Sequence, residues 1–134
     1  MPRTVSAREP HPQSVGYLAK AITYATTGIG TANTVLLGVL PAGAMITDIV
    51  ARVSAAFNAA TTNVLIVGTA ADDDAIIAAG DVTEGSIGSA RVTTGLGTLY
   101  TADTPLYIKY SQTGTAATAG AATIAVTFIR ASDG

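Results

Sequence analysis

The sequence contains no cysteine and no tryptophan, and charged residues occupy only 12% of its 134 positions. A chain without cysteine has no disulfide, no thiolate nucleophile and no cysteine-based zinc site, and it suits either a reducing or an oxidising compartment. The net charge is -2, and the seven lysines and arginines are scattered along the chain. Proteins bind nucleic acids through clustered basic side chains that neutralise phosphates, so we do not expect nucleic acid as a partner.

Long apolar segments are also missing. Threonine, glycine or aspartate interrupts the longest apolar stretches well before the 18 residues or so that a membrane-spanning helix needs, which predicts no such helix and no membrane partner. The first residues, MPRTVSAREPHPQS, contain no apolar region of the kind found in secretory signals, so we expect no signal peptide.

Residues 1–14 differ in composition from the rest of the chain, with three of the five prolines and the only histidine. Proline fixes φ, lacks a backbone N–H and pushes the preceding residue toward an extended geometry. We therefore expect an extended arm over residues 1–14 and a single domain over residues 15–134, a length that suits one domain. The arm is either a frayed terminus or a segment that docks on a neighbouring subunit. The contact residues expected in the second case are Pro2, Arg3, Arg8, Pro10 and Pro12.

From residue 15 onward the pattern is that of strands. The chain contains 26 alanines, 21 threonines and 14 glycines, and the threonines and glycines argue against a helical bundle because both weaken helix interiors. In residues 46–57, Ile49, Ala51 and Val53 alternate with Asp48 and other outward positions, which is typical of a strand with one buried face. Period-two patterns or β-rich composition predict strands over 16–26, 34–40, 46–57, 63–69, 89–94, 97–101, 106–110 and 122–128.

Glycine, proline and asparagine separate these runs at near-regular spacing. About eight short strands of this kind predict an all-β fold, a jelly-roll-like antiparallel β-sandwich. Residues 72–79 are expected to form at most a short helix or a turn, because aspartate caps helix starts and Gly80 follows the segment.

Residues for catalysis are few. His11 lies between two prolines of the arm, where we expect it to be solvated without the positioned partner that a catalytic base requires. The chain has no G-x-S-x-G nucleophile motif, and its G-x-G fragments at Gly28 and Gly95 lack the third glycine of a dinucleotide fingerprint. The sequence therefore predicts no enzyme, no catalytic residues and no cofactor site.

Five carboxylates gather within a short stretch, Asp72, Asp73, Asp74, Asp81 and Glu84. Hard cations such as Ca²⁺ prefer several oxygen ligands, and paired carboxylates also serve glycosidases. The spacing does not match an EF-hand loop, and a solvated loop, or a helix start that favours aspartate through the helix dipole, explains the cluster better, so we expect no metal site. A small calcium- or sugar-binding module stays an alternative.

Outward strand positions carry threonine and alanine where a solitary monomer usually carries lysine and glutamate. Such faces suit a protein whose surface is covered by copies of the same chain. The five tyrosines either rim a contact surface or pack in the core.

The run LPAGAMITDIVARVSAAFNAATTNVLIVGTAADDDAIIAAGDVTEG (40–85) resembles small structural proteins of tailed bacteriophages, in particular capsid cement or decoration proteins with a jelly-roll-like fold. The run TPLYIKYSQTGTAATAGAATIAVTFI (104–129) is similar to the closing hairpin of such chains. The resemblance covers most of residues 15–130.

The resemblance implies a homotrimer without enzymatic activity, made in the host bacterial cytoplasm. It would lie on the outer capsid surface of the virion, bind the major capsid protein and clamp neighbouring subunits against the pressure of packaged DNA. Other virion parts, such as a head-fibre base, a head-completion protein or a tail protein, are the alternative.

Overall fold

The computed structural model describes residues 15–25 and 33–130, and over these residues it contains strands and no helix. The strands are β1 (Val15–Thr23), β2 (Asn33–Leu40), β3 (Ala44–Ala55), β4 (Thr62–Gly68), β5 (Gly88–Arg91), β6 (Leu99–Tyr100), β7 (Thr104–Thr113) and β8 (Ala121–Arg130). Each overlaps a run predicted from the sequence, so the all-β prediction of about eight strands is confirmed. No helix in this part of the chain is long and apolar enough to span a membrane.

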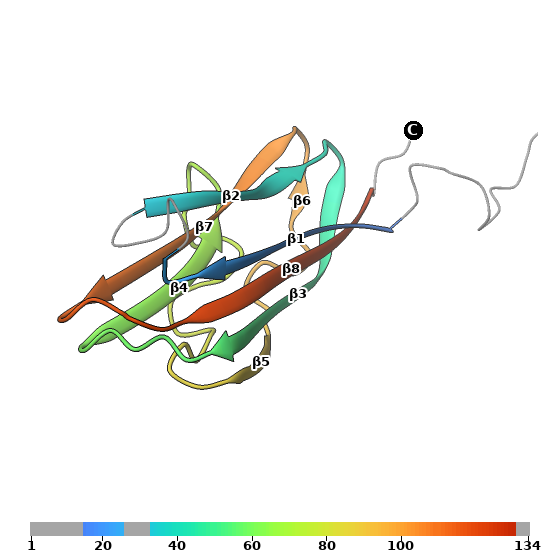
Figure 1. Cartoon of the computed structure of the whole chain (residues 1–134). Helices are drawn as coiled ribbons and strands as arrows, with labels where there is room; N and C mark the ends of the chain where they lie inside the picture. Colours follow the sequence, from blue (N-terminus) through green and yellow to red (C-terminus); the bar gives the residue numbers. More distant parts are fainter. Residues whose placement is uncertain (1–14, 26–32, 131–134) are drawn as a thin grey trace, which may run out of the picture.

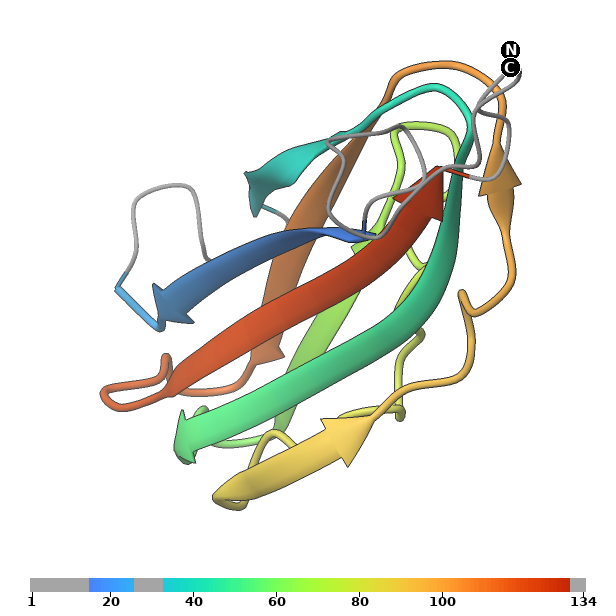
Figure 2. The same ribbon diagram turned by 90° about the vertical axis from the view of Figure 1, so that its right-hand side faces the viewer.

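The strands form two antiparallel sheets packed face to face, and the larger sheet faces the viewer in Figure 2. The larger sheet has the order β1-β8-β3-β5, with β6 pairing with the start of β3, and the smaller sheet has the order β2-β7-β4 (Figure 1). In the larger sheet β1 pairs with β8 over its whole length, and in the smaller sheet β2 pairs with β7. Strands nested in this way wind as a jelly roll, which confirms the predicted sandwich.

The core fills the space between the two sheets. Ile49, Ala51 and Val53 of β3 are buried, as their alternation predicts. Ile46 is buried as well, although strict alternation from Ile49 would turn it outward. The pairing of β3 with β8 shifts register between Ile46 and Asp48, and a bulge of this kind inserts one residue and reverses the phase of the strand.

The connection between β4 and β5 covers the outer edge of β4. The amides of Ile76 and Ile77 donate to the carbonyl oxygen of Val67 at 2.9 and 3.0 Å, and the Val67 amide donates to Ile77 at 3.1 Å. Both isoleucine side chains are fully buried. Residues 72–79 form turns and bends, in keeping with the expectation of at most a short helix or a turn, and the backbone of Ile76 and Ile77 bonds to β4.

Candidate functional site

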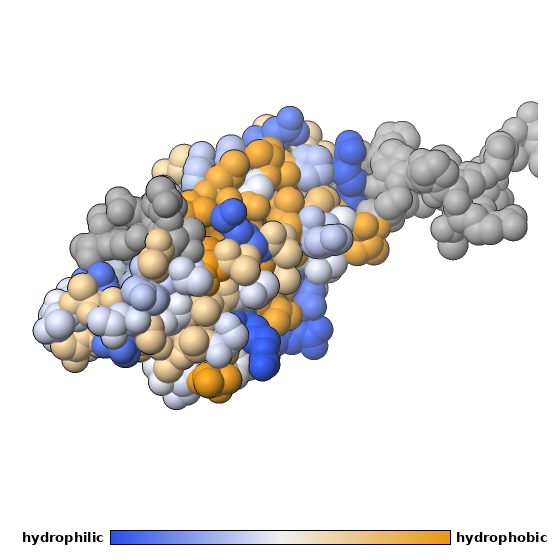
Figure 3. Space-filling model, viewed as in Figure 1, coloured by the Kyte–Doolittle hydropathy of each residue, from blue (hydrophilic) through white to orange (hydrophobic). Residues whose placement is uncertain are grey.

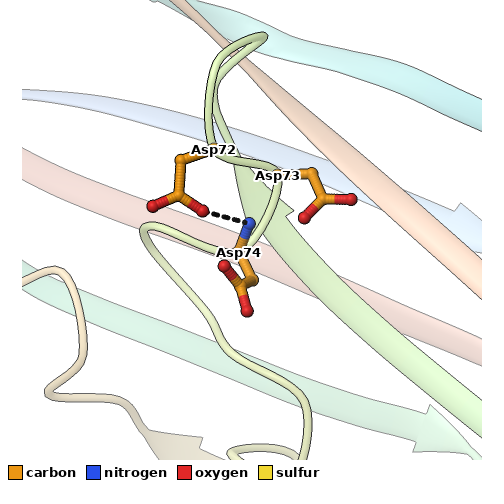
Figure 4. A group of neighbouring side chains, drawn as sticks. All are labelled: Asp72, Asp73 and Asp74. Atoms are coloured by element: carbon orange, nitrogen blue, oxygen red, sulfur yellow. Dashed lines mark hydrogen bonds between the residues drawn. The ribbon is translucent and has the colours of Figure 1, made fainter.

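Asp72, Asp73 and Asp74 lie together on the exposed loop that follows β4 (Figure 4). One carboxylate oxygen of each lies within 4.8 Å of the others. The Asp74 amide donates to Asp72 Oδ1 at 3.4 Å. A hydrogen bond with the Asp72 carboxyl, together with repulsion from its charge, raises the pKa of Asp74. The loop thus concentrates negative charge at the surface and offers oxygen atoms to a hard cation.

A lysine already neutralises part of this charge. Lys109 of β7 places Nζ 3.1 Å from Asp73 Oδ2. An open depression of about 390 Å³ surrounds the pair. Its lining consists of Thr34, Thr69, Ala70, Asp73, Tyr107 and Lys109. A cation bound to all three aspartates would compete with the lysine for Asp73.

Asp81 and Glu84 do not join the three aspartates. Asp81 Oδ2 accepts hydrogen bonds from the Ala78 amide at 2.8 Å and from the Thr94 hydroxyl at 2.5 Å. Glu84 is only 9% exposed, and its Oε2 accepts the Leu65 amide at 2.9 Å. Burial raises the pKa of the Glu84 carboxyl because removal from water penalises the charged form. The five-carboxylate site considered from the sequence is not assembled, and these two residues hold loops in place.

A second depression, of about 280 Å³, lies beside β5. It is lined by Ala51, Val53, Val82, Thr83, Ser86, Ile87, Gly88, Ser89 and Ala90. This lining contains no carboxylate, imidazole or amine.

The outer face of the β1–β8 pair is free of charge. Its ten outward positions are Val15, Tyr17, Ala19, Ala21, Thr23, Ala121, Thr123, Ala125, Thr127 and Ile129. About a quarter to a third of a soluble protein surface is normally charged, so a face of this size would usually carry several charges. The neighbouring strands β3 and β5 carry charged side chains. Arg91 Nε of β5 donates a hydrogen bond to Asp48 Oδ1 of β3 at 2.9 Å, and this contact lowers the pKa of Asp48.

The predicted contact residues of the arm, Pro2, Arg3, Arg8, Pro10 and Pro12, lie outside the described residues, as does His11. Their role in contacting a neighbour stays a prediction.

No protein-family model matches the sequence, and no curated protein matches it. Solved structures do match. A chain of the cyanophage Pam1 capsid asymmetric unit is 27% identical with a TM-score of 0.69, and the match covers 96% of this chain and 99% of that one. The chain is a phage capsid-related protein.

Two further capsid structures share the fold of this phage capsid-related protein. A chain in the acidic stable capsid of Helicobacter pylori bacteriophage KHP30 is 12% identical with a TM-score of 0.62, covering 88% of this chain and 89% of that chain. A chain in the capsid of Ralstonia phage GP4 is 14% identical with a TM-score of 0.61, covering 96% and 92%.

Two exposed apolar residues of the phage capsid-related protein were not singled out from the sequence. Leu36 and Val39 of β2 are about half exposed, while Leu37 and Leu40 are buried. Strict alternation would place Leu36 and Leu40 on one face, and a register shift between Leu36 and Gly38 breaks it. The glycine was the available signal, because glycine inside a strand often marks a bulge.

Proposed function

We propose that the protein is a non-enzymatic decoration, or cement, protein that binds the outer surface of a phage capsid and clamps neighbouring major capsid subunits. The observation that carries the proposal is the end-to-end match with one chain of the Pam1 capsid asymmetric unit, 96% of this chain against 99% of that chain. A separate chain of this size and fold is therefore a component of that shell. The charge-free outer face of β1 and β8 supports a role in assembly.

The physical basis of such a clamp is the linkage of several modest contacts. Packaged DNA pushes the shell outward, and a protein that touches several subunits raises the cost of separating them. A standard interface buries about 800 Å² per partner. Once one contact is made, the others form at high effective concentration, so the linked set binds far more tightly than any one contact. A homotrimer at a local three-fold position would link contacts in this way.

The arm is proposed to supply part of the capsid contact through Pro2, Arg3, Arg8, Pro10 and Pro12. An extended segment that becomes ordered on a partner can wrap a large surface, at an entropic cost paid on binding. The two guanidinium groups would contribute planar, bidentate hydrogen bonds to carboxylates of the shell.

The test is reconstitution on expanded shells that lack the protein. Saturable binding in many copies, together with a higher rupture temperature, is expected. A neck or tail part would instead be present in about six or twelve copies, because such parts form closed rings. Quantitative mass spectrometry of purified particles measures the copy number, and a count of that size would overturn the decoration role.

The arm is tested by the double substitution Arg3→Ala and Arg8→Ala. We expect weaker binding to shells by at least about tenfold, since hydrogen bonds to charged groups contribute about 1.5–3 kcal/mol each. The matched control removes two charges from the domain, Arg52→Ala with Arg130→Ala, and it should bind like the wild type. Equal binding by both double variants would show that the arm does not contact the shell.

A further inference from the structure

Strands β1 and β2 lie next to each other along one lateral side of the sandwich, which we call the β1–β2 side (Figure 1). Each is the terminal strand of its sheet, and among residues 15–25 and 33–130 no strand pairs with the outer edge of either. The two strands approach closely, because a Cβ at Gly38 would lie 2.7 Å from Leu18 Cδ2. The β1–β2 side therefore presents two long sheet edges together.

The opposite side of the sandwich is protected. There the backbone of Ile76 and Ile77 covers the edge of β4, and β5 has four residues and ends at Arg91. Short strands, charges and covering loops are the usual means of blocking edge-to-edge association. In β1 and β2 the only charged residue is Lys20. Exposed backbone edges without such protection favour pairing with another chain.

Large apolar side chains of β1 and β2 are exposed on the outer faces of these two strands, which adjoin the β1–β2 side and are counted as part of it. Val15 is 68% exposed, Tyr17 73%, Leu36 48% and Val39 46%. Figure 3 shows an apolar band, in orange, over the region of β2 and β1. The band continues into the charge-free outer face of the β1–β8 pair described above. Contiguous apolar surface of this kind on a soluble protein marks a site of interaction.

We propose that the β1–β2 side is covered by a second copy of this chain. A nine-residue strand is about 30 Å long, and the two sheets are about 10 Å apart. With the adjoining outer faces the surface measures about 600 Å², of the order of the 800 Å² per partner in a stable interface. Interfaces between copies are more apolar than ordinary surface, whereas the surfaces of separately folding partners resemble ordinary surface. A side whose two strands carry one charged residue, Lys20, suits permanent burial against a copy better than late docking on a shell.

The inference rests on the self-association contained in the proposed function, and two charge substitutions test it. Tyr17→Glu and Leu36→Glu each place a carboxylate within the β1–β2 side. We expect both to sediment as the 13.3 kDa monomer at concentrations where the wild type is an oligomer. The matched control is Ile87→Glu, which replaces an apolar residue 66% exposed beside β5 and should stay oligomeric. Circular dichroism shows whether each variant is folded.

A second test measures how fast a single introduced thiol is modified, and it adds no charge to the β1–β2 side. The chain has no cysteine, so Tyr17→Cys and Ile87→Cys each carry one thiol. We expect maleimide to modify the thiol of Tyr17→Cys at least about tenfold more slowly in the oligomer, because thiol reactivity follows exposure. Equal rates at the two positions, or a wild type that is monomeric at every concentration, would overturn the inference.

The decoration role and the β1–β2 interface can be disproved independently of each other. A monomer that still binds shells in many copies leaves the decoration role standing and removes the β1–β2 interface. An oligomer closed through the β1–β2 side that does not bind shells removes the decoration role and keeps the interface.

Discussion

At the scale of single residues, Glu84 is the buried ionisable carboxyl of the described chain. Its side chain accepts the Leu65 amide, and its carbonyl accepts the Phe57 amide at 2.9 Å. Glu84→Gln keeps an accepting oxygen and removes a charge from a buried site, so the free energy of unfolding at pH 7 should be unchanged or higher. Glu84→Ala leaves the Leu65 amide without its acceptor and should cost about 1–3 kcal/mol. Chemical denaturation at one protein concentration compares the two variants.

The same carboxyl predicts a dependence on pH. Burial holds the pKa of Glu84 in the folded protein above its ordinary value of 4.5. At pH values between 4.5 and the raised pKa, the folded state binds more protons than the unfolded state. The free energy of unfolding therefore falls as the pH rises through this range. Glu84→Gln should flatten this fall in denaturation curves recorded across the range. An equally steep fall in the glutamine variant would assign the effect to another group.

At the scale of elements, the segment entering β8 approaches the end of β3 too closely for a side chain. Gly120 has a φ of +148°, and a Cβ there would overlap the ring of Phe57. That ring packs on Tyr110, with 4.9 Å between ring centroids. Gly120→Ala would displace the ring from this contact, and we expect a loss of about 1–3 kcal/mol in the free energy of unfolding.

The matched control for the glycine substitution is Gly85→Ala. A Cβ at Gly85 meets nothing within 4 Å, so its effect should stay within about 0.5 kcal/mol. Thermal melting of both variants measures the difference. Similar losses would mean that the contact between Gly120 and Phe57 does not limit stability.

Most of the strands follow from the sequence because their side chains alternate between water and the core. The period of two carries that information along β7 and β8, where every second residue is buried from Leu106 to Tyr110 and from Ala122 to Phe128. The period of two does not predict burial across the bulges of β2 and β3. The position of a bulge depends on the pairing and twist of the neighbouring strand and not on local composition. The connection after β4 forms turns, the second of the two forms expected for residues 72–79, and not a short helix, because the edge of β4 takes backbone hydrogen bonds from Ile76 and Ile77.

The surfaces were less predictable than the strands. Outward alanine and threonine indicated faces that are covered, and the structure places seven such residues among the ten outward positions of one uncharged face. The five-carboxylate cluster divided because Glu84 turns inward to a backbone amide, a contact that spacing along the chain does not encode.

At the scale of the whole molecule, the two sides of the sandwich differ in what protects them, and this difference predicts how stability depends on concentration. A protein that buries its β1–β2 side only on self-association gains stability as its concentration rises. For a trimer that unfolds to monomers, a tenfold rise in concentration adds about 2.7 kcal/mol per trimer, or about 0.9 kcal/mol per chain. The denaturation midpoint of the wild type should therefore rise with protein concentration.

Tyr17→Glu should remove that rise and Ile87→Glu should keep it, because only the first residue lies on the β1–β2 side. A wild-type midpoint that stays constant over a hundredfold range of concentration would mean that the chain folds without a partner copy.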